Sequence, residues 1–185
     1  MSRLASTASE SVVEDVNERP KRDPAESDPE EFARKILLDQ LTGQARSRHE
    51  LAARLAKRNV PEEIAVRLLD RFEEVGLIDD EAFARAWVDS RQRTRGLARP
   101  ALAQELRRKG IDDETTRTVL AEVDREDEAD TARALVRKKL RSMGGLAPEV
   151  ATRRLVGMLA RKGYGPGMAF AIVREELGSQ WPADD

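Results

Sequence analysis

The chain has 185 residues, of which 39% are hydrophobic, 37% charged and 4% aromatic, with one histidine and no cysteine. The charged fraction exceeds the roughly 25% of an average domain, which favours thin helical layers over one thick hydrophobic core. The lack of cysteine excludes disulfides, thiolate metal sites and a thiol nucleophile. No apolar run approaches the ~20 residues of a membrane span, and residues 1–20 lack a signal-peptide core. A cytoplasmic protein is therefore expected.

Charge is distributed unevenly along the chain. The net charge is −2, yet residues 1–31 carry four basic and nine acidic side chains, while the other 154 residues carry 29 basic and 26 acidic ones. The acidic N-terminal segment thus masks a mildly basic body. The global charge is for this reason a poor guide to binding partners.

Residues 1–28 are rich in Ser, Glu and Pro and show no sustained apolar period, which predicts a disordered acidic tail. From Pro29 onward the apolar period is helical, beginning with Phe32, Ile36 and Leu37. No stretch alternates with the period of a strand. The expected fold class is therefore all-α.

Helix boundaries are marked by capping residues. Ser47 and Glu50 form a capping box that opens a second helix. Gly76 follows the end of a third helix, and Asp79 or Asp80 caps the next one. The same signals continue along the chain and predict about nine helices. Further starts are predicted near Pro100, Asp112, Pro148 and Pro166, and further ends near Gly110 and Gly163.

A repeat organises these helices. The apolar positions Phe32, Leu51, Leu55 and Val60 recur 51 residues later, and a third copy follows at an offset of 53. The body is therefore predicted to be an elongated array of three tandem three-helix units, each too small to be very stable alone. The expected boundaries are 1–28 for the tail, 29–78, 79–125 and 126–178 for the units, and 179–185 for a C-terminal tail.

Three aromatic residues and one acidic residue stand out from this pattern. Phe83 and Trp87 lie four residues apart in the apolar register, so packing in the core is favoured over stacking on nucleic-acid bases. Tyr164 takes an apolar position of the repeat and is also expected in the core. Glu176 stands where the first two units have an apolar residue, and Leu177 is expected to take its place.

Charge follows the repeat as well. Residues 34–58, 85–109 and 133–162, which cover the first two helices of each unit, carry net charges of +5, +6 and +8. Residues 62–81 and 112–130, in the third helices and their exits, carry −6 and −7. Units stacked in register would present a basic ridge beside an acidic one. Charge balance within the molecule is the alternative interpretation.

No constellation of residues supports catalysis or metal binding. His49 is the only histidine and has no partners at ligand or acid–base spacing. The run 163–167 resembles a phosphate loop but follows no strand and lacks the P-loop lysine, so a helix–helix turn is expected. The acidic clusters 112–114 and 126–128 lie at predicted helix N-termini, where they complement the helix dipole. We expect no enzyme, no cofactor and no metal.

The most specific segment is GLIDDEAFARAWV at residues 76–88, followed by Arg91, Gly96 and ELRRKGI at residues 105–111. This segment resembles the central signature of the bacterial RecX regulatory proteins, and the repeat architecture is similar over residues 31–178. The resemblance implies a negative regulator that binds RecA filaments on single-stranded DNA, in the filament groove or at its ends. It also implies inhibition of the RecA ATPase, strand-exchange and coprotease activities, and thereby control of recombination, DNA repair and the SOS response.

Basic side chains of the second and third units are the expected contacts to RecA or DNA, in a protein expected to be monomeric. These candidates are Arg91, Arg93, Arg95, Arg99, Arg107, Arg108, Lys109, Arg137, Lys138, Lys139, Arg141, Arg153 and Arg154. A direct DNA-binding module with a basic helix in a duplex groove is the main alternative, and weak DNA binding fits both interpretations. A helical scaffold for some other partner is the third.

Overall fold

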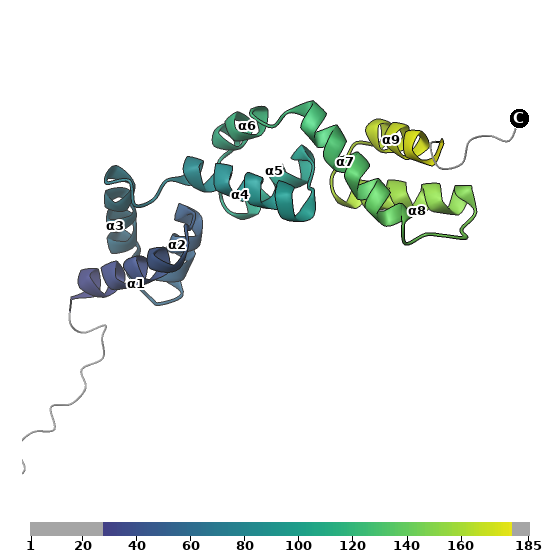
Figure 1. The fold of residues 1–185 in the computed structure, drawn as a ribbon. Coiled ribbons are helices and arrows are strands. Elements are labelled where there is room, and N and C mark those ends of the chain that lie inside the picture. The colour runs from purple at the N-terminus through teal and green to yellow at the C-terminus, as the bar shows by residue number, and fades with distance from the viewer. Residues whose placement is uncertain (1–27, 179–185) are drawn as a thin grey trace, which may run out of the picture.

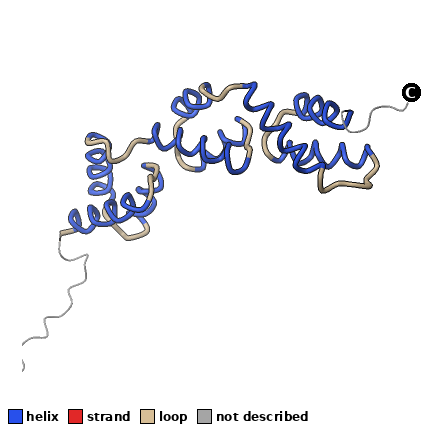
Figure 2. Tube along the Cα trace, viewed as in Figure 1, coloured by secondary structure: helices blue, strands red, loops and turns tan. Residues whose placement is uncertain are grey.

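The computed structural model describes residues 28–178, and its nine regular elements in that range are all α-helices (Figures 1 and 2). The all-α prediction is thus confirmed for the described part of the chain. The predicted acidic tail and C-terminal tail lie outside the described residues, apart from Asp28. That residue caps the first helix, because its side chain accepts a hydrogen bond of 3.0 Å from the Glu30 N–H.

Three groups of three helices follow one another along the chain, strung out in the elongated array of Figure 1. The first unit holds α1 (Pro29–Gly43), α2 (Arg48–Ala56) and α3 (Glu62–Glu74). The second holds α4 (Asp80–Arg95), α5 (Arg99–Arg108) and α6 (Asp113–Ala121). The third holds α7 (Arg125–Leu140), α8 (Pro148–Arg161) and α9 (Pro166–Gly178). The predicted array of three-helix units is confirmed.

Each unit has a hydrophobic core of its own, and its helices pack chiefly against one another. Leu55, Leu106 and Leu159 occupy the same position of the repeat, and each is completely buried. Burying one such side chain contributes roughly 1.5–3 kcal/mol. The fold therefore consists of three small cores in series, which explains how a chain so rich in charge is stable.

Local sequence sets the helix ends. Ser47 and Glu50 form the predicted capping box, in which the Ser47 side chain accepts from the Glu50 N–H at 3.2 Å and the Glu50 side chain accepts from the Ser47 N–H. Asp79, rather than Asp80, caps α4 by accepting from the Ala82 N–H at 2.8 Å. Asp80 is therefore left to contact the first unit.

The aromatic residues divide between core and surface. Phe83 and Tyr164 are buried, as expected. Trp87 is only half-buried, with its ring stacked on Phe83 at a centroid distance of 5.7 Å. Phe83 therefore accounts for only part of the surroundings of the indole.

Glu176 does not leave the core of the third unit. Its side chain is 6% exposed and accepts two hydrogen bonds from the Arg137 guanidinium, at 2.7 and 2.8 Å. Leu177 is buried beside it. The expectation that Leu177 would replace Glu176 is therefore half right, because an arginine of α7 compensates the buried carboxylate and both residues stay inside.

The junction between the first and second units consists of polar contacts at the N-terminus of α2. Ser47 Oγ donates to the Lys109 carbonyl at 2.6 Å, and the Arg48 N–H donates to Asp80 Oδ1 at 2.8 Å. An N–H of the first helical turn, which has no partner within its own helix, thereby finds one in the next unit.

The junction between the second and third units repeats this arrangement at equivalent positions. The Ala98 N–H donates to the Lys162 carbonyl at 2.9 Å, and the Arg99 N–H donates to Glu128 Oε1 at 2.8 Å. Tyr164 adds a hydrogen bond from its hydroxyl to the Gly96 carbonyl at 3.2 Å. The repeat in sequence therefore also repeats the junctions between the units.

Glycine is required at both junctions between units. A Cβ at Gly110 (φ +76°) would lie 2.2 Å from the Cβ of His49, and a Cβ at Gly163 (φ +91°) would lie 2.7 Å from the backbone nitrogen of Ala101. The equivalent residue of the first unit is Asn59, which also has a positive φ of 56°. A side chain is tolerated there because no unit precedes the first one in the described chain.

Candidate functional site

Glu105 on α5 gathers several of the cations predicted to bind partners in the second unit. It accepts hydrogen bonds from Arg91 Nε at 2.8 Å, Arg95 Nη1 at 3.0 Å and Trp87 Nε1 at 3.0 Å. The Arg91 guanidinium lies 4.0 Å from the centre of the Trp87 ring, and Lys109 Nζ lies 4.3 Å from it. Charge-assisted hydrogen bonds and cation–π contacts thus hold these cations inside the protein's own network.

The other candidates of α4 and α5 differ in how firmly they are paired. Lys109 Nζ lies 2.7 Å from Glu50 Oε1 across the first junction, with both side chains three-quarters buried. Arg107 pairs with Asp113 at 3.2 Å on the exposed surface. Exposed pairs contribute little to stability and exchange readily for another anion. Lys109 is therefore part of the first junction, whereas Arg107 stays available to a partner.

Two further candidates balance buried carboxylates. Arg99 Nε lies 3.1 Å from Glu128, whose side chain is only 6% exposed, and Arg137 holds Glu176. Burial raises the pKa of Tyr164 to about 12, and the charge of the nearby Glu128 adds to the effect. Both arginines therefore have a structural role in the second junction or the third core.

The remaining candidates are exposed and have no compensating carboxylate. They form no ion pair within residues 28–178, apart from the distant contact of Arg93 with Asp89 at 3.9 Å. Five of the six fully uncompensated ones belong to the third unit. The six are Arg108, Lys138, Lys139, Arg141, Arg153 and Arg154.

Cations also crowd the second junction. Lys162 Nζ donates to the Arg95 carbonyl. The pKa of Lys162 is lowered, first by burial and then by the positive charges of Arg95 and Lys138. Burial is the larger cause, and the contribution of Arg95 and Lys138 reflects how close these cations lie to Lys162.

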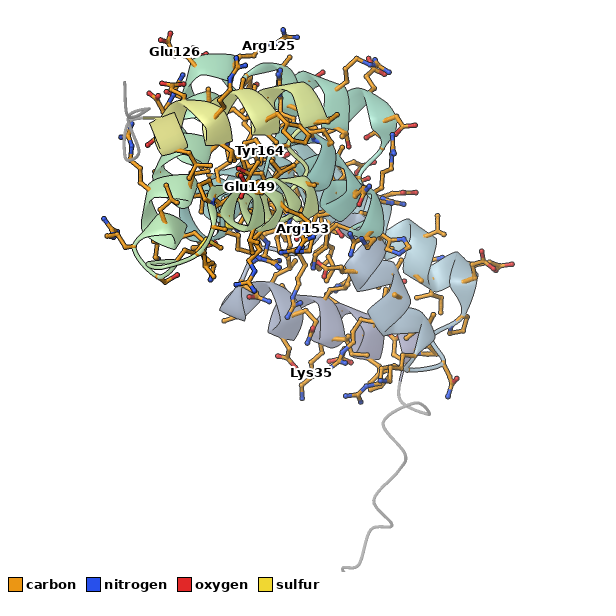
Figure 3. The ribbon with its side chains drawn as sticks, turned by 90° about the vertical axis from the view of Figure 1, so that its right-hand side faces the viewer. Lys35, Arg125, Glu126, Glu149, Arg153 and Tyr164 are labelled. Atoms are coloured by element: carbon orange, nitrogen blue, oxygen red, sulfur yellow. The ribbon has the colours of Figure 1, made fainter. Side chains whose placement is uncertain are left out.

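The charged side chains occupy different sides of the third unit. Figure 3 shows Arg153, on α8, at the lower side of this unit, toward the first unit and Lys35. Arg125 and Glu126, at the start of α7, lie at the opposite edge. The basic α8 and the acidic entrance of α7 therefore present their charges in different directions.

Sequence reasoning missed three cations at the first junction, which share a groove with the predicted candidate Arg108. Arg46, Arg54, Lys57 and Arg108 line one groove of about 490 Å³ between α2 and the end of α5. None of the four forms an ion pair with any of the residues 28–178. The +5 charge of residues 34–58 signalled this group, but the most specific sequence motif lies in the second unit and drew attention there.

The described residues contain no group of three or more His, Asp or Glu side chains arranged to hold a metal ion. Nor does any helix between residues 28 and 178 have the length and apolar character needed to cross a membrane.

Comparisons with known proteins place all three units in one family. Family models of the first, second and third three-helix domains of RecX match residues 33–72, 79–120 and 126–173. Regulatory protein RecX of Streptomyces coelicolor is 55% identical over 150 residues, 81% of this chain and 80% of the relative. That of Thermobifida fusca is 49% identical over 148 residues, 80% of both chains. The crystal structure of RecX from Lactobacillus salivarius shares the fold, with a TM-score of 0.73 at 19% identity over 80% of this chain and 96% of that one.

Proposed function

Because the chain belongs to the RecX family of regulatory proteins, we propose that it is a negative regulator of RecA in the cytoplasm. It binds RecA filaments on single-stranded DNA and inhibits their ATPase, strand-exchange and coprotease activities. Recombination, DNA repair and the SOS response are restrained as a result. The observation that carries this proposal is the match of all three units, in order, to the three domains of the family.

The arrangement of the units supports a mechanism based on many weak contacts. A filament offers the same surface at regular intervals, and the three units repeat the same junction along an elongated array. Contacts made by one unit raise the effective concentration of the next, so modest interactions combine into tight binding. An array that bridges neighbouring RecA protomers opposes the motions that couple ATP hydrolysis to strand exchange.

Uncompensated cations are the proposed contacts to RecA or DNA. Lys138, Lys139 and Arg141 at the end of α7 and Arg153 and Arg154 on α8 are exposed and have no carboxylate partner within residues 28–178. A partner that binds them does not first have to break an ion pair. Electrostatic attraction of this kind speeds association and confers salt dependence. Arg91, Arg95, Arg99 and Lys109 of the second unit instead hold the array in shape.

The RecA ATPase on single-stranded DNA, titrated with this protein, tests the proposal. A Lys138→Glu/Lys139→Glu/Arg141→Glu variant is expected to lose most of the inhibition. The matched control is Arg117→Glu/Arg125→Glu/Arg174→Glu, which makes the same charge change at exposed arginines that also lack ion pairs within residues 28–178. The control is expected to inhibit nearly as well as the unaltered protein. Equal inhibition by both variants would remove the end of α7 from the mechanism.

Binding to naked DNA separates this proposal from a direct DNA-binding module. A RecA regulator inhibits at protein concentrations at which it binds naked DNA only weakly. Tight duplex binding with a steep salt dependence, together with an unaffected RecA ATPase, would instead favour the DNA-binding module.

A further inference from the structure

The groove at the first junction concentrates positive charge without an internal anion to balance it. Arg46, Arg54, Lys57 and Arg108 line it, and none of them has an ion-pair partner in the described chain. The one carboxylate among the lining residues, Glu50, is already engaged by Lys109 at 2.7 Å. Cations that line the same groove repel one another, so the groove favours an anionic occupant.

The chain itself supplies an anionic segment of suitable length. Residues 10–18, ESVVEDVNE, carry four carboxylates, three valines and no cation. The groove offers four cations, while of its apolar lining residues Ala53 is exposed and Leu51 is only 1% exposed. The segment and the groove are therefore complementary in charge.

The position of the groove matches the reach of this segment. Gln40 lines the groove and lies on the same helix as Pro29. At 1.5 Å per residue, the separation along α1 is roughly 17 Å. The ten residues 19–28 that join residues 10–18 to α1 can span at most about 33–36 Å, which is enough to cover this separation. Tethering to the same chain raises the effective concentration of the segment at the groove.

We propose that residues 10–18 dock in this cationic groove and mask it from polyanions, so that the N-terminal segment inhibits binding by the chain's own cations. Coulomb attraction between the carboxylates of residues 10–18 and the cations of the groove directs the segment to this site, and salt weakens that attraction. An external polyanion has to displace the segment before it gains the groove. This proposal does not depend on RecA as the partner.

Paramagnetic broadening in NMR spectra of the full chain tests the docking. The chain has no cysteine, so a Ser11→Cys variant carries a nitroxide label at one position. At low salt, the backbone amides of Ala53, Arg54 and Lys57 are expected to broaden, and the broadening is expected to vanish in high salt. Neutralising the segment as Glu10→Gln/Glu14→Gln/Asp15→Asn/Glu18→Gln should also abolish it. Absence of broadening at low salt, or broadening centred on the third unit, would overturn the proposal.

Binding of a short single-stranded oligonucleotide at low salt tests the masking. Deletion of residues 2–18 is expected to tighten binding roughly three- to tenfold, because the groove becomes competent in every molecule rather than in a minor fraction. The deletion should have no such effect in an Arg54→Gln/Lys57→Gln/Arg108→Gln background. It should keep its effect in the matched Arg117→Gln/Arg125→Gln/Arg174→Gln background. An unchanged affinity after deletion, or a gain that persists without the groove cations, contradicts masking. Because RecA is absent from both experiments, their failure leaves the proposed regulation of RecA untouched.

Discussion

The second and third units share one fold and a similar excess of basic residues, but they use their cations differently. In the second unit, Glu105 pairs with Arg91 and Arg95, and Arg91 also lies over the Trp87 ring. In the third unit, Arg137 pairs with Glu176, but Lys138, Lys139, Arg141, Arg153 and Arg154 have no carboxylate partner within the described chain. A basic residue is therefore available for binding only if its own protein has not already supplied an anion. The middle unit carries the most specific sequence motif and much of its charge serves the structure.

The largest expected effect comes from a substitution that disrupts the junction between these two units. Gly163→Ala adds a Cβ that lies 2.7 Å from the Ala101 backbone, at a φ of +91°. Overpacking costs about 1–3 kcal/mol and the left-handed backbone another 1–2, so a loss of roughly 2–5 kcal/mol in free energy of unfolding is expected. Gly76→Ala is the matched control, because φ is +71° there and nothing lies within 4 Å.

Urea unfolding of the two alanine variants measures this difference. The control variant is expected to lose only the backbone contribution, about 1–2 kcal/mol. Equal losses in the free energy of unfolding for Gly163→Ala and Gly76→Ala would mean that the second junction accommodates a side chain without loss of stability.

The next effect concerns Glu128, the buried carboxylate at the same junction. Glu128→Ala removes the acceptor of the Arg99 N–H and guanidinium, at 2.8 and 3.1 Å. Hydrogen bonds to a buried charged group contribute about 1.5–3 kcal/mol, and a destabilisation of that size is expected in thermal or urea unfolding. Glu126→Ala, on the exposed face of the same helix turn, serves as control. It should lose only the helix-dipole contribution of about 0.3–1 kcal/mol.

A third change makes the second unit resemble the third. Glu105→Gln keeps an acceptor for Trp87 but removes the charge that compensates Arg91 and Arg95. Binding to single-stranded DNA is expected to tighten a few-fold. Its log–log salt slope should steepen by up to about 1.4, since each phosphate contact adds about 0.7.

Glu81→Gln controls for the added positive charge in this experiment. It removes one carboxylate partner of Arg85, which still pairs with Glu122 at 2.9 Å. No steeper salt slope is expected. A steeper slope in both variants would show that net charge, rather than release of particular arginines, governs DNA binding.

The last expected effect is absent at neutral pH and appears only at high pH. Burial raises the pKa of Tyr164 to about 12 from an ordinary value near 10. The folded state therefore favours the neutral phenol, so this contribution to stability is complete below pH 10 and is lost as the pH rises toward 12. Urea unfolding at pH values on both sides of 10 measures the loss. Tyr164→Phe should show a shallower decline over that range, and an identical decline would contradict the argument.

The sequence alone determined the fold and the family resemblance. Apolar periodicity and capping residues act over a few positions, so they predict helices such as α2, which opens at the Ser47 capping box. The recurrence of apolar residues at a fixed spacing then predicts three units, because each copy of the pattern buries its own small core. The same local pattern placed Phe83 and Tyr164 correctly in the core.

Only the tertiary structure decided which cations are engaged. Glu105 meets Arg91 fourteen positions away and Trp87 eighteen positions away, while Arg99 meets Glu128 at a separation of 29. The cationic groove likewise joins Arg46 to Arg108 across two units. Ion pairs form between any groups that folding brings within about 4 Å, whatever their distance in sequence, and composition therefore gives the amount of charge but not its partners.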